Sequence, residues 1–124
     1  MTEFSGRSVL VTGATGFIGS RLCEHLVAKG ALVHGTFRTK ESIQDNRISW
    51  HQVPLEEIEG VRDLFDAIKP AYIFHLASHV VGARHLEVVL PTFQSNLHTT
   101  VNLLTAAAEK GCRRIEEGDS RTGK

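Results

Sequence analysis

Three glycines at a spacing of three residues, Gly13, Gly16 and Gly19, lie between a strand-like segment and a helix-like segment. Residues 8–11 (Ser-Val-Leu-Val) form a short apolar run, which is typical of a strand buried on both faces of a sheet. Residues 18–27 repeat apolar side chains at helical spacing. A strand, a glycine-rich turn and a helix in this order predict a phosphate-binding site at the start of the helix.

Each glycine of this turn has its own expected role. Gly13 has no Cβ and can turn sharply, Gly16 would let the backbone approach a diphosphate, and Gly19 would let the helix press onto the strand. The N–H groups around Gly16, Phe17 and Ile18 then point at the anion. The pattern is therefore typical of a dinucleotide site.

Other ligands and partners fit the sequence less well. A phosphate loop of the Gly-Lys-Ser/Thr type needs a lysine, but Ser20 and Arg21 follow Gly19. Fourteen basic residues balance fourteen acidic ones, so no field of one sign favours nucleic acid or an acidic membrane. No apolar run approaches 18 residues and no signal pattern opens the chain. We expect a cytoplasmic protein without a nucleic-acid or membrane partner.

The cysteines and histidines form no metal-binding pattern. Cys23 and Cys112 are expected to be reduced thiols. His75 and His79 are four residues apart and His85 follows, but a four-residue spacing favours one shared face only on a helix. Since His75 lies at the end of a predicted strand, we expect no metal site.

The rest of the chain alternates strand and helix patterns, which predicts an α/β fold with a parallel sheet. The expected strands are 31–37, 48–53, 71–76 and 113–115, and the expected helices are 57–69 and 92–110, with a loop or short helix at 39–46. Pro70 and Gly111 end the helices and Pro91 begins the last one. That last helix carries apolar residues in register at Phe93, Leu97, Val101, Leu104 and Ala108.

Three stretches of the sequence resemble the extended short-chain dehydrogenases/reductases, the NAD-dependent epimerase/dehydratase family. They are residues 11–19 (Val-Thr-Gly-Ala-Thr-Gly-Phe-Ile-Gly), 73–78 (Ile-Phe-His-Leu-Ala-Ser) and 96–107, which is similar to the family's Asn-x-x-Gly-Thr-x-Asn-Leu-Leu-x-Ala helix. Their order and spacing agree from about residue 7 to residue 115. The resemblance implies a three-layer, Rossmann-like, doubly wound sheet with strand order 3-2-1-4-5, of which this chain holds the N-terminal portion.

The resemblance also implies a pyridine dinucleotide, with NADP preferred over NAD. Members that prefer NAD carry an acidic residue near the end of the second strand, where this chain has Phe37, Arg38 and then Lys40. A guanidinium can pair with the 2′-phosphate of NADP through two hydrogen bonds, whereas a carboxylate would repel that group. A solvated surface arginine is the alternative interpretation of Arg38.

By the same resemblance, the turn from Gly13 to Gly19 would hold the pyrophosphate, and Asn96 would approach the nicotinamide. Leu55 would cover the adenine, although Pro54 replaces the acidic residue that the family often has there. Alternatively, Leu76 and Ala77 are strand core and Asn96 is an ordinary helix residue. The implied cofactor-binding residues are Gly13, Thr15, Gly16, Phe17, Ile18, Gly19, Arg38, Leu55, Leu76, Ala77, Ser78 and Asn96.

The catalytic residues of the family have no counterpart in this sequence. Family members use a Tyr-x-x-x-Lys pair and a serine, whereas the single tyrosine, Tyr72, is followed four residues later by Leu76. We therefore expect Tyr72 to be a core residue and the chain to contain no catalytic residue. Residues 1–115 would form an incomplete dinucleotide-binding domain, and 116–124 a polar, mobile tail.

Several functions remain open at this point. The leading one is the NAD(P)-binding portion of a nucleotide-sugar epimerase, dehydratase or reductase that is not catalytic alone. The alternatives are a non-catalytic NAD(P) sensor or regulatory module, an enzyme completed by a complementing chain, and a fragment without function. An exposed sheet edge would favour a homo-oligomer.

Overall fold

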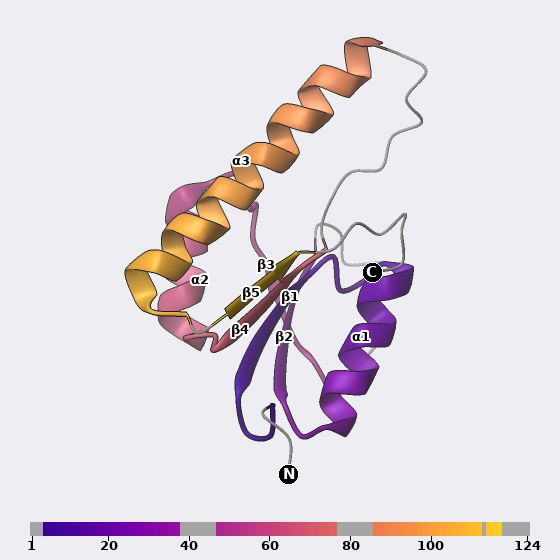
Figure 1. Ribbon diagram of the computed structural model, residues 1–124, viewed down its shortest axis with the longest axis vertical. Helices are drawn as coiled ribbons and strands as arrows, with labels where there is room; N and C mark the ends of the chain where they lie inside the picture. Colours follow the sequence, from indigo (N-terminus) through magenta and orange to yellow (C-terminus); the bar gives the residue numbers. More distant parts are fainter. Residues whose placement is uncertain (1–3, 38–46, 77–85, 113, 118–124) are drawn as a thin grey trace.

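The computed structural model shows a five-stranded parallel sheet between two layers of helices (Figure 1). It describes residues 4–37, 47–76, 86–112 and 114–117, with the backbone alone described for 86–96 and 114–117. The strands are β1 (Ser8–Thr12), β2 (Leu32–Phe37), β3 (Ser49–Gln52), β4 (Tyr72–His75) and β5 (Arg114–Glu117); the helices are α1 (Phe17–Ala28), α2 (Ile58–Ile68) and α3 (Leu86–Lys110). The strand order β3-β2-β1-β4-β5 confirms the predicted Rossmann-like topology.

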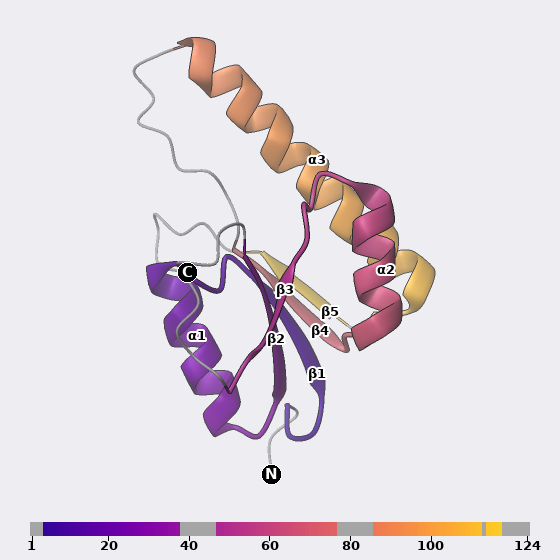
Figure 2. The same cartoon turned by 180° about the vertical axis from the view of Figure 1, so that it is seen from behind.

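Both faces of the sheet are covered, which explains the continuous apolar pattern of the central strand. Figures 1 and 2 show α1 on one face and α2 with α3 on the other. Val9 and Val11 of β1 pack with Leu26 on the α1 side, whereas Leu10, between them in the sequence, packs with Phe65 on the α2 and α3 side. The apolar residues expected at helical spacing in 18–27 pack against the sheet, and in α2 Val61, Leu64 and Phe65 do the same.

The helix stops predicted at Pro70 and Gly111 are present, and α1 also ends before a glycine. Helix α1 ends with Lys29 as its C-cap, and Gly30 has a φ of +85°. Helix α2 ends at Lys69, whose N–H donates to the carbonyl of Phe65 (2.8 Å) just before Pro70. Gly111, with a φ of +79°, follows α3. Glycine adopts such positive φ values without the steric cost that a Cβ brings.

Helix α3 differs from its prediction in two ways. It begins at Leu86 rather than at residue 92, so Pro91 is its sixth residue and not its first. Because proline has no N–H, the helix forgoes one backbone hydrogen bond there. The predicted apolar stripe also does not face the core: Leu97, Val101 and Leu104 are each about half exposed (52%, 48% and 47%).

A different face of α3 packs against α2 and the sheet. It consists of Thr99, Asn102, Leu103, Ala106 and Ala107, all less than 9% exposed. Small side chains allow the helix backbone to approach its neighbours closely, so Ala106 and Ala107 are buried beside Leu103.

Ion pairs fix α3 to α2 along their exposed side. Arg62 of α2 donates from Nε and Nη2 to the two carboxylate oxygens of Glu109, each at 3.0 Å, and from Nη1 to Glu59. The hydrogen bonds from Arg62 lower the pKa of the Glu109 carboxyl group. Two parallel bonds of this kind fix the relative orientation of the two helices.

Strand β5 continues two residues beyond the expected domain boundary at 115. Glu116 lies opposite Phe74 and Glu117 opposite His75 in the parallel ladder with β4. The hydrogen bonds of the ladder join backbone groups, so the two glutamates can take part in them. Strand β5 is also an edge of the sheet within the described residues. Strand β5 therefore reaches Glu117, and the rest of the expected tail, 118–124, lies outside the described residues.

Candidate nucleotide-binding site

The glycine-rich turn joins β1 to α1 at the carboxyl edge of the sheet. Strand β1 ends at Thr12, and Gly13 has a φ of +68°, a left-handed conformation that favours glycine. The N–H of Gly16 donates to the carbonyl of Gly13 (3.1 Å), and Gly16 is the N-cap of α1. The sharp turn expected at Gly13 is therefore present.

Gly19 is where α1 comes closest to this turn. A Cβ built on Gly19 would lie 2.0 Å from the carbonyl oxygen of Gly13 and 3.0 Å from the Cα of Ala14. Both are backbone atoms, which cannot rotate away as the end of a side chain could. Helix α1 can occupy its position only because residue 19 has no side chain.

The packing of the chain does not by itself require glycine at position 16. Gly16 has an extended conformation (φ −75°, ψ 174°) that any residue adopts. Among the described residues, the one close neighbour that a Cβ there would meet is the carbonyl oxygen of Gly13, at 3.4 Å. A glycine where the protein itself would accept a Cβ is expected where a ligand approaches the backbone closely.

The N-terminus of α1 is suited to an anion. Among the described residues no side chain caps Gly16, and the first turn carries no acidic residue. The N–H groups of a first helical turn carry a partial positive charge equivalent to about half an elementary charge. Phe17 is 76% exposed, and the guanidinium carbon of Arg21 lies 4.9 Å from the centre of its ring, so a cation stands beside this turn.

A hydrogen-bonded cluster ties β4 to β1 beside the turn. Thr12 and His75 are opposite each other in the sheet, and Thr12 Oγ1 and His75 Nδ1 share a hydrogen bond of 2.6 Å. The N–H of Leu76 donates to the same hydroxyl oxygen (3.0 Å). Burial disfavours the charged imidazolium and lowers the pKa of His75 to about 4. The cluster fixes where the chain leaves β4, which is the start of the segment expected to run along the cofactor.

The family of the protein follows from a comparison of the whole chain. The profile of the NAD dependent epimerase/dehydratase family matches residues 9–117, a range that runs from β1 through the glycine-rich turn to the end of β5. The chain belongs to the NAD dependent epimerase/dehydratase family. The resemblance inferred from three short motifs is thereby confirmed.

Two of the similar curated proteins are named for reactions of nucleotide sugars, and a third is Cinnamoyl-CoA reductase 1 of Petunia hybrida, at 33% identity (93% of this chain, 35% of the relative). The chain is 30% identical to UDP-glucose 4-epimerase 2 of Arabidopsis thaliana (94% of this chain, 37% of the relative). It is 34% identical to a dTDP-4-dehydro-6-deoxy-D-allose reductase of a Streptomyces species (88% and 36%). Among solved structures, UDP-glucose 4-epimerase of Thermus thermophilus in complex with NAD is similar at 30% identity and a TM-score of 0.78 (87% and 36%).

The chain spans little more than a third of the length of these four proteins. The family assignment therefore concerns the N-terminal part of the relatives. No helix within the described residues is long and apolar enough to cross a membrane.

The structure places only some of the expected cofactor-binding residues of this epimerase/dehydratase domain. Gly13, Thr15, Gly16, Phe17, Ile18 and Gly19 come together in the turn and the first turn of α1. Arg38 follows the end of β2, but it lies outside the described residues, as do Ala77 and Ser78. Asn96 lies in α3, where only its backbone is described.

The side chains of Leu55 and Leu76 are buried, and the expectation that Leu55 covers the adenine stays a prediction. Both side chains belong to the core: Leu55 is 6% exposed on the α2 and α3 side, and Leu76 is 9% exposed on the α1 side. Leu76 follows the end of β4, and its role toward a cofactor stays a prediction. The backbone of each residue is the part that lies at the carboxyl edge of the sheet.

Tyr72 has the core position predicted for it. It is 5% exposed in β4, pairs with Val9 in the ladder, and its ring lies 5.1 Å from that of Phe4 in an edge-to-face contact. A buried side chain at the start of β4, at the amino edge of the sheet, is not placed to exchange a proton with a substrate at the carboxyl edge.

Two polar residues important for the site were missed by the sequence analysis. Asn102, only 5% exposed, donates from Nδ2 to the backbone carbonyl of Leu55 (2.9 Å), and Thr12 joins β1 to β4. A signal for Asn102 was present, because it shares the i, i+3, i+4, i+7 spacing of the buried face with Thr99, Leu103 and Ala106. A polar residue on a buried face needs a partner, and that partner is a long-range one.

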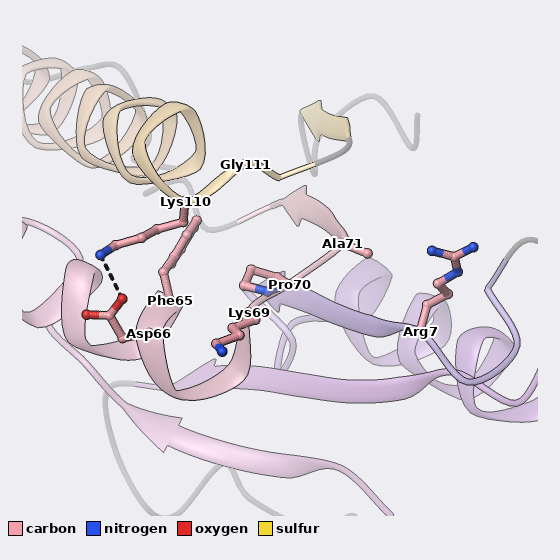
Figure 3. Close-up of a pocket in the computed structure, with 8 residues that line it drawn as sticks. All are labelled: Arg7, Phe65, Asp66, Lys69, Pro70, Ala71, Lys110 and Gly111. Carbon is pink, nitrogen blue, oxygen red and sulfur yellow. Dashed lines mark ion pairs between the residues drawn. The ribbon is translucent and has the colours of Figure 1, made fainter.

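A pocket of about 380 Å³ lies at the opposite, amino edge of the sheet (Figure 3). Its charged lining is Arg7, Lys69, Lys110 and Asp66, with Lys110 and Asp66 paired at 2.7 Å. Helices α2 and α3 both end here, so cations near their last carbonyls are stabilising. The pocket is separate from the glycine-rich turn, and two of its cations, Lys69 and Lys110, lie at the ends of α2 and α3.

A second histidine cluster lies between β2 and β3. His34 Nδ1 and His51 Nε2 are 3.0 Å apart, and burial lowers the pKa of both rings, with the neighbouring charge of His51 adding to the effect on His34. The described residues hold no group of three or more histidine, cysteine or acidic side chains that could bind a metal ion. His79 and His85 lie outside the described residues.

Proposed function

We propose that this chain binds NADP, or NAD with lower affinity, as the cofactor-binding portion of a nucleotide-sugar epimerase, dehydratase or reductase, and that it does not catalyse a reaction alone. The observation that carries the proposal is the uncapped N-terminus of α1 beside Gly16, where the protein has room for a Cβ but carries none. A cytoplasmic location is part of the proposal. The names of two of the relatives support the substrate class.

The residues of the turn fit the pyrophosphate of such a cofactor. The first-turn N–H groups of Phe17 and Ile18 would donate to its oxygens, and Gly16 would let those oxygens approach. The cofactor itself supplies hydride transfer. What the chain does is bind and orient: the Thr12–His75 bond fixes β4 against β1, and Arg38 would pair with the 2′-phosphate.

A titration with NADPH and NADH tests the proposal. We expect NADPH to bind about tenfold more tightly than NADH, a difference of about 1.4 kcal/mol. Trp50, the single tryptophan, provides a fluorescence signal for both titrations. Gly16→Ala is the matched variant, because its methyl group fits the protein but enters the phosphate space, so both affinities should fall by about tenfold or more.

Three results would contradict parts of this proposal. Absence of binding to either dinucleotide contradicts the function, and a tenfold preference for NADH contradicts the role of Arg38. Turnover of a nucleotide sugar by the purified single chain contradicts the absence of catalytic residues. Turnover only after a complementing chain is added identifies the partner-completed enzyme instead.

Self-association is a further expectation. β3 and β5 form the two edges of the sheet within the described residues, and an unpaired edge strand favours pairing with a second copy. We expect light scattering to show a mass above the 13.7 kDa of one chain. Leu104→Glu, which changes the exposed stripe of α3 and leaves both edges intact, should still associate. A monomer at every concentration would contradict pairing through the edges.

A further inference from the structure

The side chain of Asn102 connects α3 to the loop that follows β3. The Nδ2 of Asn102 donates to the carbonyl oxygen of Leu55 at 2.9 Å, across 47 positions of sequence. Asn102 is 5% exposed and Leu55 is 6% exposed, so water does not replace this bond readily. Strand β3 ends at Gln52, which places Leu55 just beyond the carboxyl edge of the sheet.

The loop is held at two points, and both lie on its inner side. The Leu55 side chain packs in the cluster that includes Val61 and Leu103, and its carbonyl accepts the Asn102 bond. A local turn, in which the N–H of Glu57 donates to the carbonyl of Pro54 (3.0 Å), shapes the same segment. Loss of the Asn102 amide would leave a buried carbonyl without its side-chain donor, which is costly unless the loop moves.

The position of this loop matters for one half of the proposed ligand. It follows β3, the neighbour of β2, and Arg38 comes directly after β2, so the loop stands on the adenosine side of the proposed cofactor. Because the side chain of Leu55 is buried, the loop would contact the cofactor through its backbone. The Asn102 bond sets the position of that backbone.

We propose that Asn102 is a positioning residue for the adenosine half of the dinucleotide, because its buried amide fixes the backbone of Leu55 at the carboxyl edge of the sheet. The inference rests on the proposed function. It adds a residue that does not touch the cofactor and that acts through the loop. It also separates the two halves of the site, since the pyrophosphate contacts at α1 do not depend on α3.

Binding of two cofactor fragments to Asn102→Leu tests the proposal. Leucine has a similar shape and no N–H donor. We expect the Kd of 2′,5′-ADP to rise about fivefold or more, whereas the Kd of nicotinamide mononucleotide stays within about twofold of wild type. Leu103→Val is the matched control, because it disturbs the same buried face of α3 and keeps the amide. It should leave the ratio of the two Kd values unchanged.

A second measurement uses the wild-type chain and does not depend on the folding of a variant. The side-chain amide resonances of Asn102 should shift when 2′,5′-ADP is added and stay in place when nicotinamide mononucleotide is added. Two results would overturn the positioning role if NADPH still binds. One is an unchanged ratio of the Kd values for 2′,5′-ADP and nicotinamide mononucleotide in Asn102→Leu, and the other is that the amide resonances do not shift when 2′,5′-ADP is added. A wild-type chain that binds no fragment and no NADPH would overturn the proposed function as well.

Discussion

Gly19→Ala is expected to destabilise the fold by about 3 kcal/mol or more and to remove cofactor binding. The new Cβ would lie 2.0 Å from the carbonyl oxygen of Gly13, where a normal contact needs more than 3 Å. Since the obstacle is backbone, either α1 or the turn must shift, and overpacking of this kind costs about 1–3 kcal/mol or more. For a domain of this size the midpoint of thermal unfolding should fall by roughly 10 °C or more.

Relief of the clash would itself damage the site. If α1 moves away from Gly13, its first-turn N–H groups move with it, and the phosphate geometry is lost even where the chain still folds. Thermal unfolding followed by circular dichroism and a titration with NADPH measure the two effects. A variant with wild-type stability and wild-type affinity would show that Gly19 does not set the position of α1.

Gly60→Ala is the matched control for this experiment. Gly60 lies in the first turn of α2, and its added Cβ would meet only the Val53 side chain, at 3.5 Å, which is an ordinary contact. Alanine is a better helix former than glycine by up to about 1 kcal/mol. Gly60→Ala should therefore be neutral or slightly stabilising and should leave the affinity for NADPH unchanged.

The contrast between these glycines shows what the sequence could predict. The spacing of Gly13, Gly16 and Gly19 between two apolar patterns predicted the turn, because local backbone sterics determine such a turn. The alternation of strands and helices predicted a parallel sheet, and the family resemblance implied its order. These features depend on near neighbours in the chain or on the period of the side chains.

The orientation of α3 was predicted wrongly because hydrophobicity alone favours its leucines. The buried face holds Leu103, Ala106 and Ala107 with the polar Asn102, whereas Leu97 and Leu104 are about half exposed. Close approach of helix backbones selects small side chains, and a single sequence does not show which partner a helix approaches. The start of α3 was placed too late in the sequence because proline usually marks the first turn of a helix, whereas Pro91 is the sixth residue of α3.

Contacts between distant segments were also beyond the sequence. The bond between Thr12 and His75 joins residues 63 positions apart and depends on the register of β1 with β4. The Asn102–Leu55 bond depends on where α3 lies over the sheet. For Arg38, Ala77 and Ser78 the sequence remains the basis of the assignment, and their roles stay predictions.

The Thr12–His75 pair leads to the second large effect, a loss of stability in mild acid. The pKa of His75 is lowered by burial from 6.5 to about 4. Above pH 6.5 the imidazole is neutral in the folded and the unfolded chain, so its contribution to the free energy of unfolding is constant. Below pH 6.5 the unfolded chain binds a proton that the folded chain does not bind until about pH 4.

The free energy of unfolding should therefore fall by about 1.4 kcal/mol for each pH unit in this window, or about 3 kcal/mol between pH 6.5 and pH 4. His34 and His51, whose pKa values are also lowered, act in the same direction, so the wild-type profile alone does not isolate the effect of His75.

The variant His75→Asn isolates the effect of His75, because an asparagine can still form a hydrogen bond with Thr12 but does not titrate. Urea unfolding measured from about pH 7.5 to about pH 4 should give a profile for His75→Asn that is flatter than that of wild type by about 3 kcal/mol. Parallel profiles for the two proteins would mean that the folded chain accepts a charged imidazole at this position, and that burial of His75 does not cause the loss of stability in acid.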